Sequence, residues 1–197
     1  MKGLAALSGG VDSAVATALL CEEGHGLTGV TMRLLDASLL GGPQAVQACA
    51  MEAAIEGARA SCQQLGIPHL TLDLAAQFRS CVVEPFCRAY LEGRTPNPCI
   101  ECNRHLKIAE LQRLRRQREL DFVATGHYAR VRFDQPTGRW QLLRAADKAK
   151  DQSYVLYRAG QDDLAHLRLP LGNLAKGDVR ALAAELGLPG ADAPESQ

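Results

Sequence analysis

The sequence predicts an α/β fold in which helices cover both faces of a parallel sheet. Short apolar runs of strand length alternate with longer helical patterns, and parallel strands need crossover helices of this kind. The strand-like runs are residues 3–7, 27–35, 70–74 and 122–125, and the helical patterns are residues 11–22, 45–65, 78–91, 104–119 and 176–186. Two further runs, 128–133 and 140–144, flank a proline–glycine turn and predict a small β-hairpin.

Length and composition narrow the class of protein. The chain has 197 residues, which suits one domain or one domain with a small appendage. Its formal net charge is zero, so contacts with nucleic acid would have to come from local basic patches. Seven cysteines at irregular spacing argue against a secreted disulfide framework. No apolar run is long enough to span a membrane and no signal-peptide pattern is present, so we expect a cytoplasmic protein with reduced thiols and no membrane partner.

The most specific pattern is a glycine turn between the first strand and the first helix. Glycines let the backbone approach an anion, and the start of the helix offers unpaired N–H groups at its positive end. Serine hydroxyls on both sides add further donors. The candidate nucleotide-binding residues are therefore Ala6, Leu7, Ser8, Gly9, Gly10, Val11, Asp12 and Ser13.

Residues 8–13 read SGGVDS, which is neither GxxxxGK[ST] nor GxGxxG. The pattern resembles the loop of the ATP pyrophosphatases, and this resemblance implies that ATP is bound with its β,γ-pyrophosphate in the loop. Asp12 cannot attract phosphate by charge, so it is expected to hold Mg²⁺ or to cap the helix. The alternative interpretation is a glycine turn whose serine and aspartate serve only as caps.

A proline-rich loop carries a second candidate site. Cys99 and Cys102 lie in residues 93–104, and Cys102 is expected just before a helix with Asn103 as its N-cap. A helix N-terminus and nearby basic side chains lower the pKa of a thiol, which would suit a nucleophile or a sulfur carrier. The C-x-x-C spacing also allows a redox pair or metal or cluster ligation, although a zinc site would need two more ligands. The remaining alternative is two cysteines that only pack.

The helical pattern that follows is basic, with Arg113, Arg115, Arg116 and Arg118 close together. Such a run is either a solvated helix face or a surface that contacts phosphates.

Taken together, the motifs resemble the tRNA-specific 2-thiouridylase (MnmA-type) family of N-type ATP pyrophosphatases. The resemblance extends in order over almost the whole chain and implies a Rossmann-like sheet of the adenine nucleotide alpha hydrolase type. The matching segments, besides SGGVDS, are GVTM at 29–32, LGIPH at 65–69, GRTPNP at 93–98, ATGHYAR at 124–130, KDQSY at 150–154, and 170–172 with Lys176 and 179–180.

The resemblance implies a transferase that adenylates the C2 oxygen of the wobble uridine of tRNA with ATP and Mg²⁺ and then transfers sulfur. Met32 would back the adenine, and Gly126 would contact ATP. Cys102 would be the nucleophilic cysteine, with Asp12 and Cys99 as further catalytic residues. The residues that would contact tRNA are Asn97, Pro98 and Cys99 at the target base, and Lys150, Asp151 and Gln152 elsewhere. The implied partners are tRNA and a sulfur-donor protein that carries a persulfide, or free sulfide.

Two departures from the family pattern matter. Cys99 stands where the family commonly has aspartate, and the cysteine variant is associated with iron–sulfur ligation, here by Cys99 and Cys102. The chain stops at Gln197, just before the expected sulfur-carrying cysteine. We therefore expect a pyrophosphatase domain over 1–197, with a core to about residue 160 and the start of a linker over 161–197, without the family's C-terminal domains. The alternatives are a truncated domain that binds nucleotide or tRNA without complete sulfur-transfer chemistry, and another sulfurtransferase or amide synthetase of the same superfamily.

Overall fold

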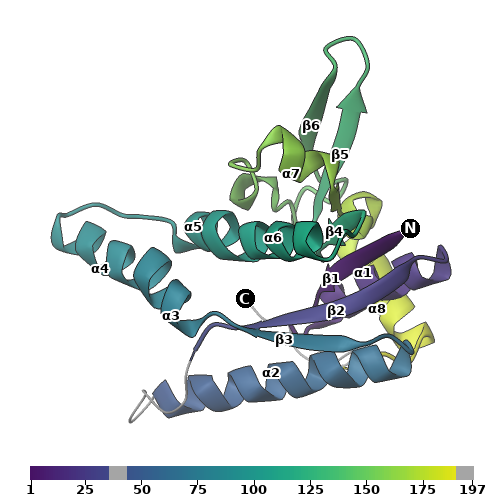
Figure 1. Cartoon of the computed structure of the whole chain (residues 1–197), viewed down its shortest axis with the longest axis horizontal. Coiled ribbons are helices and arrows are strands. Elements are labelled where there is room, and N and C mark those ends of the chain that lie inside the picture. Colours follow the sequence, from purple (N-terminus) through teal and green to yellow (C-terminus); the bar gives the residue numbers. More distant parts are fainter. Residues whose placement is uncertain (36–43, 190–197) are drawn as a thin grey trace.

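The computed structural model describes residues 1–35 and 44–189, with side chains in the second range from residue 50 onward. A five-stranded parallel sheet in the order β3-β2-β1-β4-β7 forms its centre (Figure 1). The strands are β1 (Lys2–Ala6), β2 (Gly26–Arg33), β3 (His69–Asp73), β4 (Phe122–Ala124) and β7 (Leu167–Arg168). The predicted α/β class is confirmed, because every pair of neighbouring strands in this sheet is parallel.

Helices cover both faces of the sheet. The main ones are α1 (Val11–Glu22), α2 (Gln44–Gln64), α6 (Ala109–Gln117) and α8 (Lys176–Glu185). On one face, Val15 of α1, Ala58 of α2 and Val179 of α8 share one buried cluster. On the other face, Leu111 of α6 packs with Leu4 and Val123 of the central strands. Successive residues of β1 enter different clusters, since Leu4 and Ala6 pack in the cluster with Leu111 and Ala5 packs in a separate cluster with Phe122. This is the period-two pattern of a strand buried on both sides.

The helical segment before the cysteine loop is less regular than the sequence predicts. Instead of one helix over 78–91, the chain forms α3 (Ala75–Phe78), a π-helical turn η2 (Arg79–Val83) and α4 (Glu84–Leu91). Pro85 lies in the first turn of α4, directly after the π-helical turn. Pro85 has no N–H to donate to the carbonyl of Cys81 one turn earlier, so the α-helical ladder is interrupted at this point.

The cysteine loop is shorter than predicted, because a helix begins at Pro98. The chain runs through α5 (Pro98–Cys102), the π-helical turn η3 (Asn103–Ile108) and α6. Asn97 is the N-cap, and its Oδ1 accepts a hydrogen bond from the N–H of Cys99 at 3.1 Å. The prediction that Asn103 caps the helix is therefore wrong. Asparagine followed by proline at the first helical position is the stronger start signal.

The predicted hairpin is confirmed as β5 (Ala129–Asp134) and β6 (Arg139–Arg144), which projects from the body of the molecule (Figure 1). The remaining elements are η4 (Ser153–Val155), α7 (Gln161–Ala165) and η5 (Pro170–Asn173). Residues 161–189 contribute β7 to the sheet and α8 to the helix layer against α1. In the part of the chain described here, no helix is both long and apolar enough to cross a membrane.

Phe122 is the largest fully buried side chain, with its ring against Gly3 of the neighbouring strand. We expect Phe122→Ala to lower the free energy of unfolding by about 3–5 kcal/mol, because it removes a buried ring and leaves a cavity. Phe133→Ala is the matched control, since Phe133 is 38% exposed on the hairpin and should cost about 1 kcal/mol. Urea unfolding measures both variants, and equal losses would contradict this assignment of the core.

Candidate functional site

The candidate site lies at the carboxyl ends of β1 and β4, where the strand order reverses. β1 pairs with β2 on one side and with β4 on the other, so the chain leaves these two strands in opposite directions along the sheet. Open parallel sheets bind ligands at this kind of switch point. The glycine loop follows β1, and Gly126 follows β4, so the fold brings the two segments to the same edge (Figure 1).

Two glycines allow the backbone segments at this edge to approach closely. Gly9 has a φ of +77°, and a Cβ there would lie 2.3 Å from the carbonyl oxygen of Ala54 in α2. A Cβ on Gly126 would lie 2.9 Å from the backbone nitrogen of Ser13. Both positions therefore require glycine on steric grounds. The second contact joins two of the predicted ATP-binding segments directly.

The loop itself is held by the two serines. Ser13 Oγ accepts a hydrogen bond from the N–H of Ser8 at 3.1 Å and donates one to the carbonyl of Gly10 at 2.9 Å. The N–H groups of residues 9–12, in contrast, have no acceptor among the residues that the structure describes. Four unpaired donors at a helix N-terminus form an anion-binding site. Ala6 ends β1, and Leu7 is fixed by donating its N–H to the carbonyl of Val30 at 2.9 Å.

Asp12 is engaged by two side chains from distant parts of the chain. Lys176 Nζ at the start of α8 lies 2.6 and 2.8 Å from the two carboxylate oxygens, and Tyr128 Oη donates to Oδ1 at 2.8 Å. The prediction that Asp12 caps the helix is wrong, because α1 has Gly10 as its N-cap and no side-chain cap bond. Lys176 and Tyr128 were not predicted as site residues. Their positions inside the matching segments 124–130 and 176–180 were the available signal.

The donor set fits a polyphosphate better than it fits a metal ion held by protein alone. Unpaired N–H groups, the Ser8 hydroxyl and the Lys176 ammonium all favour negative oxygens. Within the described ranges no group of three or more His, Cys, Asp or Glu side chains could hold a metal ion. A Mg²⁺ ion at this edge would therefore take most of its ligands from phosphate oxygens and water, and would compete with Lys176 for Asp12. The same finding leaves Cys99 and Cys102 with no clustered third ligand for iron–sulfur chemistry.

Met32 lies near the end of β2 and His127 lies just after β4, so they follow the two strands that flank β1. Met32 is half-buried near the end of β2 and packs against the apolar cluster formed by Leu74, Leu106 and their neighbours. His127 was not predicted, and its Nδ1 lies 2.8 Å from Thr125 Oγ1. Burial, reinforced by the charge of Lys107, lowers the pKa of His127 to about 3. This imidazole is therefore neutral near pH 7 and can exchange hydrogen bonds without carrying charge.

The two cysteines occupy different environments on one helix. Cys99 is exposed in the first turn of α5, whereas Cys102 is buried against Leu74, Val82 and Leu106. Burial raises the pKa of the Cys102 thiol, Lys107 opposes that rise, and Cys99 adds to it. The prediction that Cys102 has a lowered pKa at a helix N-terminus is therefore wrong, because the helix starts four residues earlier and the thiol points into an apolar cluster.

The segment predicted to lie against tRNA is bonded into the protein. Gln152 Oε1 accepts the N–H of Tyr128 at 3.0 Å, and the N–H of Gln152 donates to the Tyr128 carbonyl at 2.8 Å. Asp151 accepts the N–H of Ala145 at 2.9 Å and the hydroxyl of Ser153 at 2.9 Å. Partial desolvation would raise the pKa of Asp151, but these hydrogen bonds outweigh it and lower the pKa. Lys150 is half-buried beside them. Gln152 thus holds the tyrosine that contacts Asp12.

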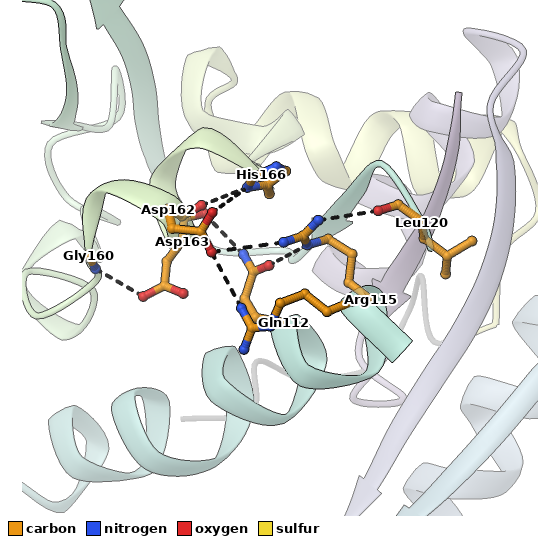
Figure 2. A network of polar contacts seen from close by, with 8 residues as sticks. Gln112, Arg115, Leu120, Gly160, Asp162, Asp163 and His166 are labelled. Carbon is orange, nitrogen blue, oxygen red and sulfur yellow. Dashed lines mark hydrogen bonds and ion pairs between the residues drawn. The ribbon is translucent and has the colours of Figure 1, made fainter. Parts of the chain in front are cut away.

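The basic helix is largely paired within the protein. Arg115 is 8% exposed and donates to Gln112 Oε1 at 2.6 Å and to the Leu120 carbonyl at 3.3 Å (Figure 2). Arg113 pairs with Glu110 at 2.8 Å, and Arg116 pairs with Asp162 at 3.4 Å. Arg118 is exposed. The helix therefore matches the solvated-face interpretation. Arg115 Nη2 also lies 3.9 Å from Asp162 Oδ2, which links α6 to α7.

Comparison with known proteins gives one family. The sequence model described as "tRNA methyl transferase HUP domain" matches residues 1–197. A protein of Roseiflexus castenholzii named tRNA-specific 2-thiouridylase MnmA is 47% identical over 210 residues, covering 100% of this chain and 56% of that protein. A protein of the same name from Chloroflexus aurantiacus is 50% identical over 194 residues, covering 98% of this chain and 53% of that protein. The chain thus spans about half the length of these curated relatives.

Solved structures agree on the fold. A 4-thiouridine synthetase in complex with RNA and ATP superposes with a TM-score of 0.56 at 16% identity, covering 100% of this chain and 43% of that one. An NMN synthetase from Francisella tularensis superposes with a TM-score of 0.53 at 21% identity, covering 99% of this chain and 66% of that one. At these identities the likeness shows a shared fold.

The environments of the two cysteines predict unequal reactivity. We expect iodoacetamide near neutral pH to alkylate Cys99 at least about tenfold faster than Cys102, because the thiolate is the reactive form and burial disfavours it. Because its pKa is raised, the Cys102 thiol stays protonated to higher pH than an ordinary thiol. Its alkylation rate should therefore rise only at pH values above the ordinary pKa of cysteine. Peptide mass spectrometry measures both rates, and in urea the two should converge. Faster alkylation of Cys102 in the folded protein would contradict the structure.

Proposed function

The chain belongs to the tRNA methyl transferase HUP domain family, and on that premise we propose that it is the ATP-binding, adenylating part of a tRNA 2-thiouridylase. The observation that carries the proposal is the set of unpaired N–H groups at residues 9–12, next to the Lys176–Asp12 pair. The thiouridylase name of the relatives at 47–50% identity supports the reaction.

The loop would hold the β- and γ-phosphates of ATP through the free N–H groups and the Ser8 hydroxyl. This placement leaves the α-phosphorus open to attack at the mouth of the site. Lys176 would balance the charge of the departing pyrophosphate. Asp12 would be the protein ligand of a Mg²⁺ ion, which would add positive charge beside the phosphates. Met32 and Gly126 would line the adenosine side of the site, where Gly126 already contacts the start of α1.

In the first step, the C2 oxygen of the wobble uridine attacks the α-phosphorus and the bond to pyrophosphate breaks. The uridine oxygen is then part of a good leaving group, AMP. The target base must leave the anticodon stack to be reached, as enzymes acting on bases require. Asn97, Pro98 and Cys99 would contact that base, although the Asn97 side chain also caps α5. Residues 150–152 would face tRNA while they hold Tyr128.

In the second step, sulfur attacks C2 and AMP leaves. With free sulfide, no oxidation or reduction is needed. With a persulfide from a carrier protein, the outer sulfur, carried on Cys102, would form the bond to C2. Attack of the Cys99 thiolate on Cys102 Sγ would then release that sulfur and leave a disulfide, which an external thiol reduces. Because burial raises the pKa of Cys102, this route requires that bound RNA uncover the thiol.

The buried Cys102 also favours a second candidate. A thiol that is 8% exposed among Leu74, Val82 and Leu106 is placed as a packing residue. On that reading this part of the protein binds and adenylates the RNA, and sulfur transfer depends on groups outside these 197 residues.

We further propose that the pyrophosphatase domain extends through α8, since Lys176 belongs to the same site.

The test is incubation of the chain with ATP, tRNA and sulfide. We expect tRNA-dependent formation of AMP and pyrophosphate, together with 2-thiouridine in the nucleoside mass spectrum. Lys176→Met should slow pyrophosphate release by about a hundredfold, because it removes a charge that stabilises the leaving group. Lys2→Met is the matched control, because Lys2 is exposed at the start of β1, at the edge of the sheet opposite the site. Its rate should stay within about twofold.

The products distinguish the candidates. Pyrophosphate release without 2-thiouridine would select the second candidate. Formation of ADP, or no nucleotide cleavage in the presence of tRNA, would contradict both. Equal rates for the two lysine variants would remove Lys176 from the site.

A further inference from the structure

A small pocket lies where η3, η4 with the residues that follow it, and α7 meet. Its volume is about 30 Å³. Apolar side chains form its floor, and four polar or charged side chains lie around them. One of the four, Asp163, uses its carboxylate to accept the N–H of Gly160 at 3.0 Å. The residues that matter here are Ile108, Val155 and Leu156 on the floor, and Asn103, Arg104 and Arg158 around it.

The side-chain oxygen of Asn103 is the unusual feature of this pocket. Asn103 is 3% exposed, and its Nδ2 donates to the carbonyl of Cys99 at 2.9 Å. A carbonyl can only accept, so this bond fixes the orientation of the amide and directs Oδ1 away from it. Among the described residues, Oδ1 is the one buried side-chain oxygen or nitrogen without a hydrogen-bond partner. A buried acceptor of this kind is destabilising unless a ligand or water donates to it.

Gln112, two turns further along the same helix, shows the contrast. It is fully buried, its Nε2 donates to the Asp163 carbonyl at 3.1 Å, and its Oε1 accepts from Arg115 at 2.6 Å (Figure 2). Both ends of that amide are used inside the protein. The helix thus carries one buried amide that is satisfied and one that offers an acceptor to the pocket.

The surroundings indicate which ligand would donate to Asn103. Tyr154 and Tyr157 on the η4 segment are 57% and 62% exposed, next to the floor residues Val155 and Leu156. Arg104 is exposed and has no ion-pair partner within the described ranges, whereas Arg158 pairs with Glu101. Exposed aromatic rings stack on bases, and arginine binds phosphate. The ligand should therefore have an N–H donor for Asn103, a flat and partly apolar body, and a phosphate for Arg104. An unpaired nucleotide has all three.

We propose that this pocket receives the hydrogen-bond-donor edge of an unpaired base of the RNA, and that Asn103 Oδ1 is the acceptor. A volume of about 30 Å³ accommodates the donor group at the edge of a base. The rest of the ring would lie outside the pocket, where the exposed rings of Tyr154 and Tyr157 could stack on it. Neither cysteine and no residue of the glycine loop lines the pocket, so the bound base is a different one from the base that reacts. The inference rests on the proposed function and adds a positioning contact for the RNA.

The experiment is titration of the chain with a fluorescent anticodon stem-loop RNA, followed by anisotropy. Asn103→Leu keeps the volume of the side chain and removes the acceptor, and it should weaken binding about tenfold. Gln112→Leu is the matched control, because it removes a buried amide of the same helix that does not line the pocket. We expect Gln112→Leu to lower the melting temperature and to leave the affinity for RNA within about twofold.

Abasic RNAs identify the base. One abasic position in the loop, other than the target uridine, should weaken binding to the native chain about tenfold and should have no further effect on Asn103→Leu. If Asn103→Leu binds as tightly as the native chain, the pocket holds only water and the proposal is overturned. The proposal would also be overturned if, for every abasic RNA, the fold-loss in affinity from the missing base and the fold-loss from Asn103→Leu multiplied as independent effects.

The salt dependence tests the charged side of the pocket. Arg104→Gln should reduce the slope of log affinity against log salt by about 0.7, the value for one phosphate of a single strand. An unchanged slope would overturn the assignment of Arg104. Pyrophosphate release by the native chain, measured in parallel, separates the two proposals. If the native chain releases pyrophosphate but Asn103→Leu binds RNA with unchanged affinity, the pocket proposal alone is wrong. If Asn103→Leu weakens RNA binding but the native chain releases no pyrophosphate, the proposed function is wrong and the pocket proposal still holds.

Discussion

The ion pair between Lys176 and Asp12 is the interaction on which the rest of the site depends. It joins residues 164 positions apart, at 2.6 and 2.8 Å, and so ties α8 to the loop after the first strand. Without a cation beside it, the carboxylate of Asp12 would repel the phosphate groups that the neighbouring N–H groups attract. Tyr128 donates to the same carboxylate, which brings the segment after β4 into the cluster. One carboxylate thus connects three parts of the chain at the switch point of the sheet.

The environment of this pair explains why the surrounding loops are rigidly placed. Gln152 makes two hydrogen bonds to the backbone of Tyr128, one through its side-chain oxygen and one through its own N–H. Asp147 Oδ2 accepts the N–H of Lys176 at 3.1 Å. Gly126 touches the start of α1, where any side chain would push the two segments apart. The segment 145–153 therefore positions Lys176 and Tyr128, which in turn contact Asp12 of the phosphate loop. This role is separate from any contact that the segment makes with RNA. A site held in this way needs little rearrangement to bind a polyphosphate.

Much of the fold could be predicted from local patterns. Alternating strand and helix runs indicated the parallel sheet, and the turn at 136–138 indicated the hairpin, because both signals are short-range. The glycine loop was recognisable because its chemistry is contiguous in sequence. Asn97 and Pro98 were a local signal for the helix start at Pro98. The basic helical pattern after Cys102 was a competing signal that favoured a later start. Competing local signals of this kind are the usual source of errors at element boundaries.

The rest depends on contacts between distant residues. Nothing near Cys102 in sequence shows that Leu74 and Val82 cover it, so neither its burial nor the direction of its pKa shift could be predicted. Lys176 reaches Asp12 only because α8 packs on α1. The free oxygen of Asn103 follows from the bond that its own amide makes to Cys99, and from the packing of residues 155–159 around the same pocket. Tertiary packing decides such environments, and sequence spacing alone does not.

The central claim is that the loop after β1 binds the pyrophosphate end of ATP. Isothermal titration calorimetry of the chain with ATP, pyrophosphate and AMP tests it most directly. We expect ATP and pyrophosphate to bind and to compete with each other, and AMP to bind at least about tenfold more weakly because it lacks the groups that the loop holds. Binding of AMP as tight as that of ATP, without competition from pyrophosphate, would contradict it.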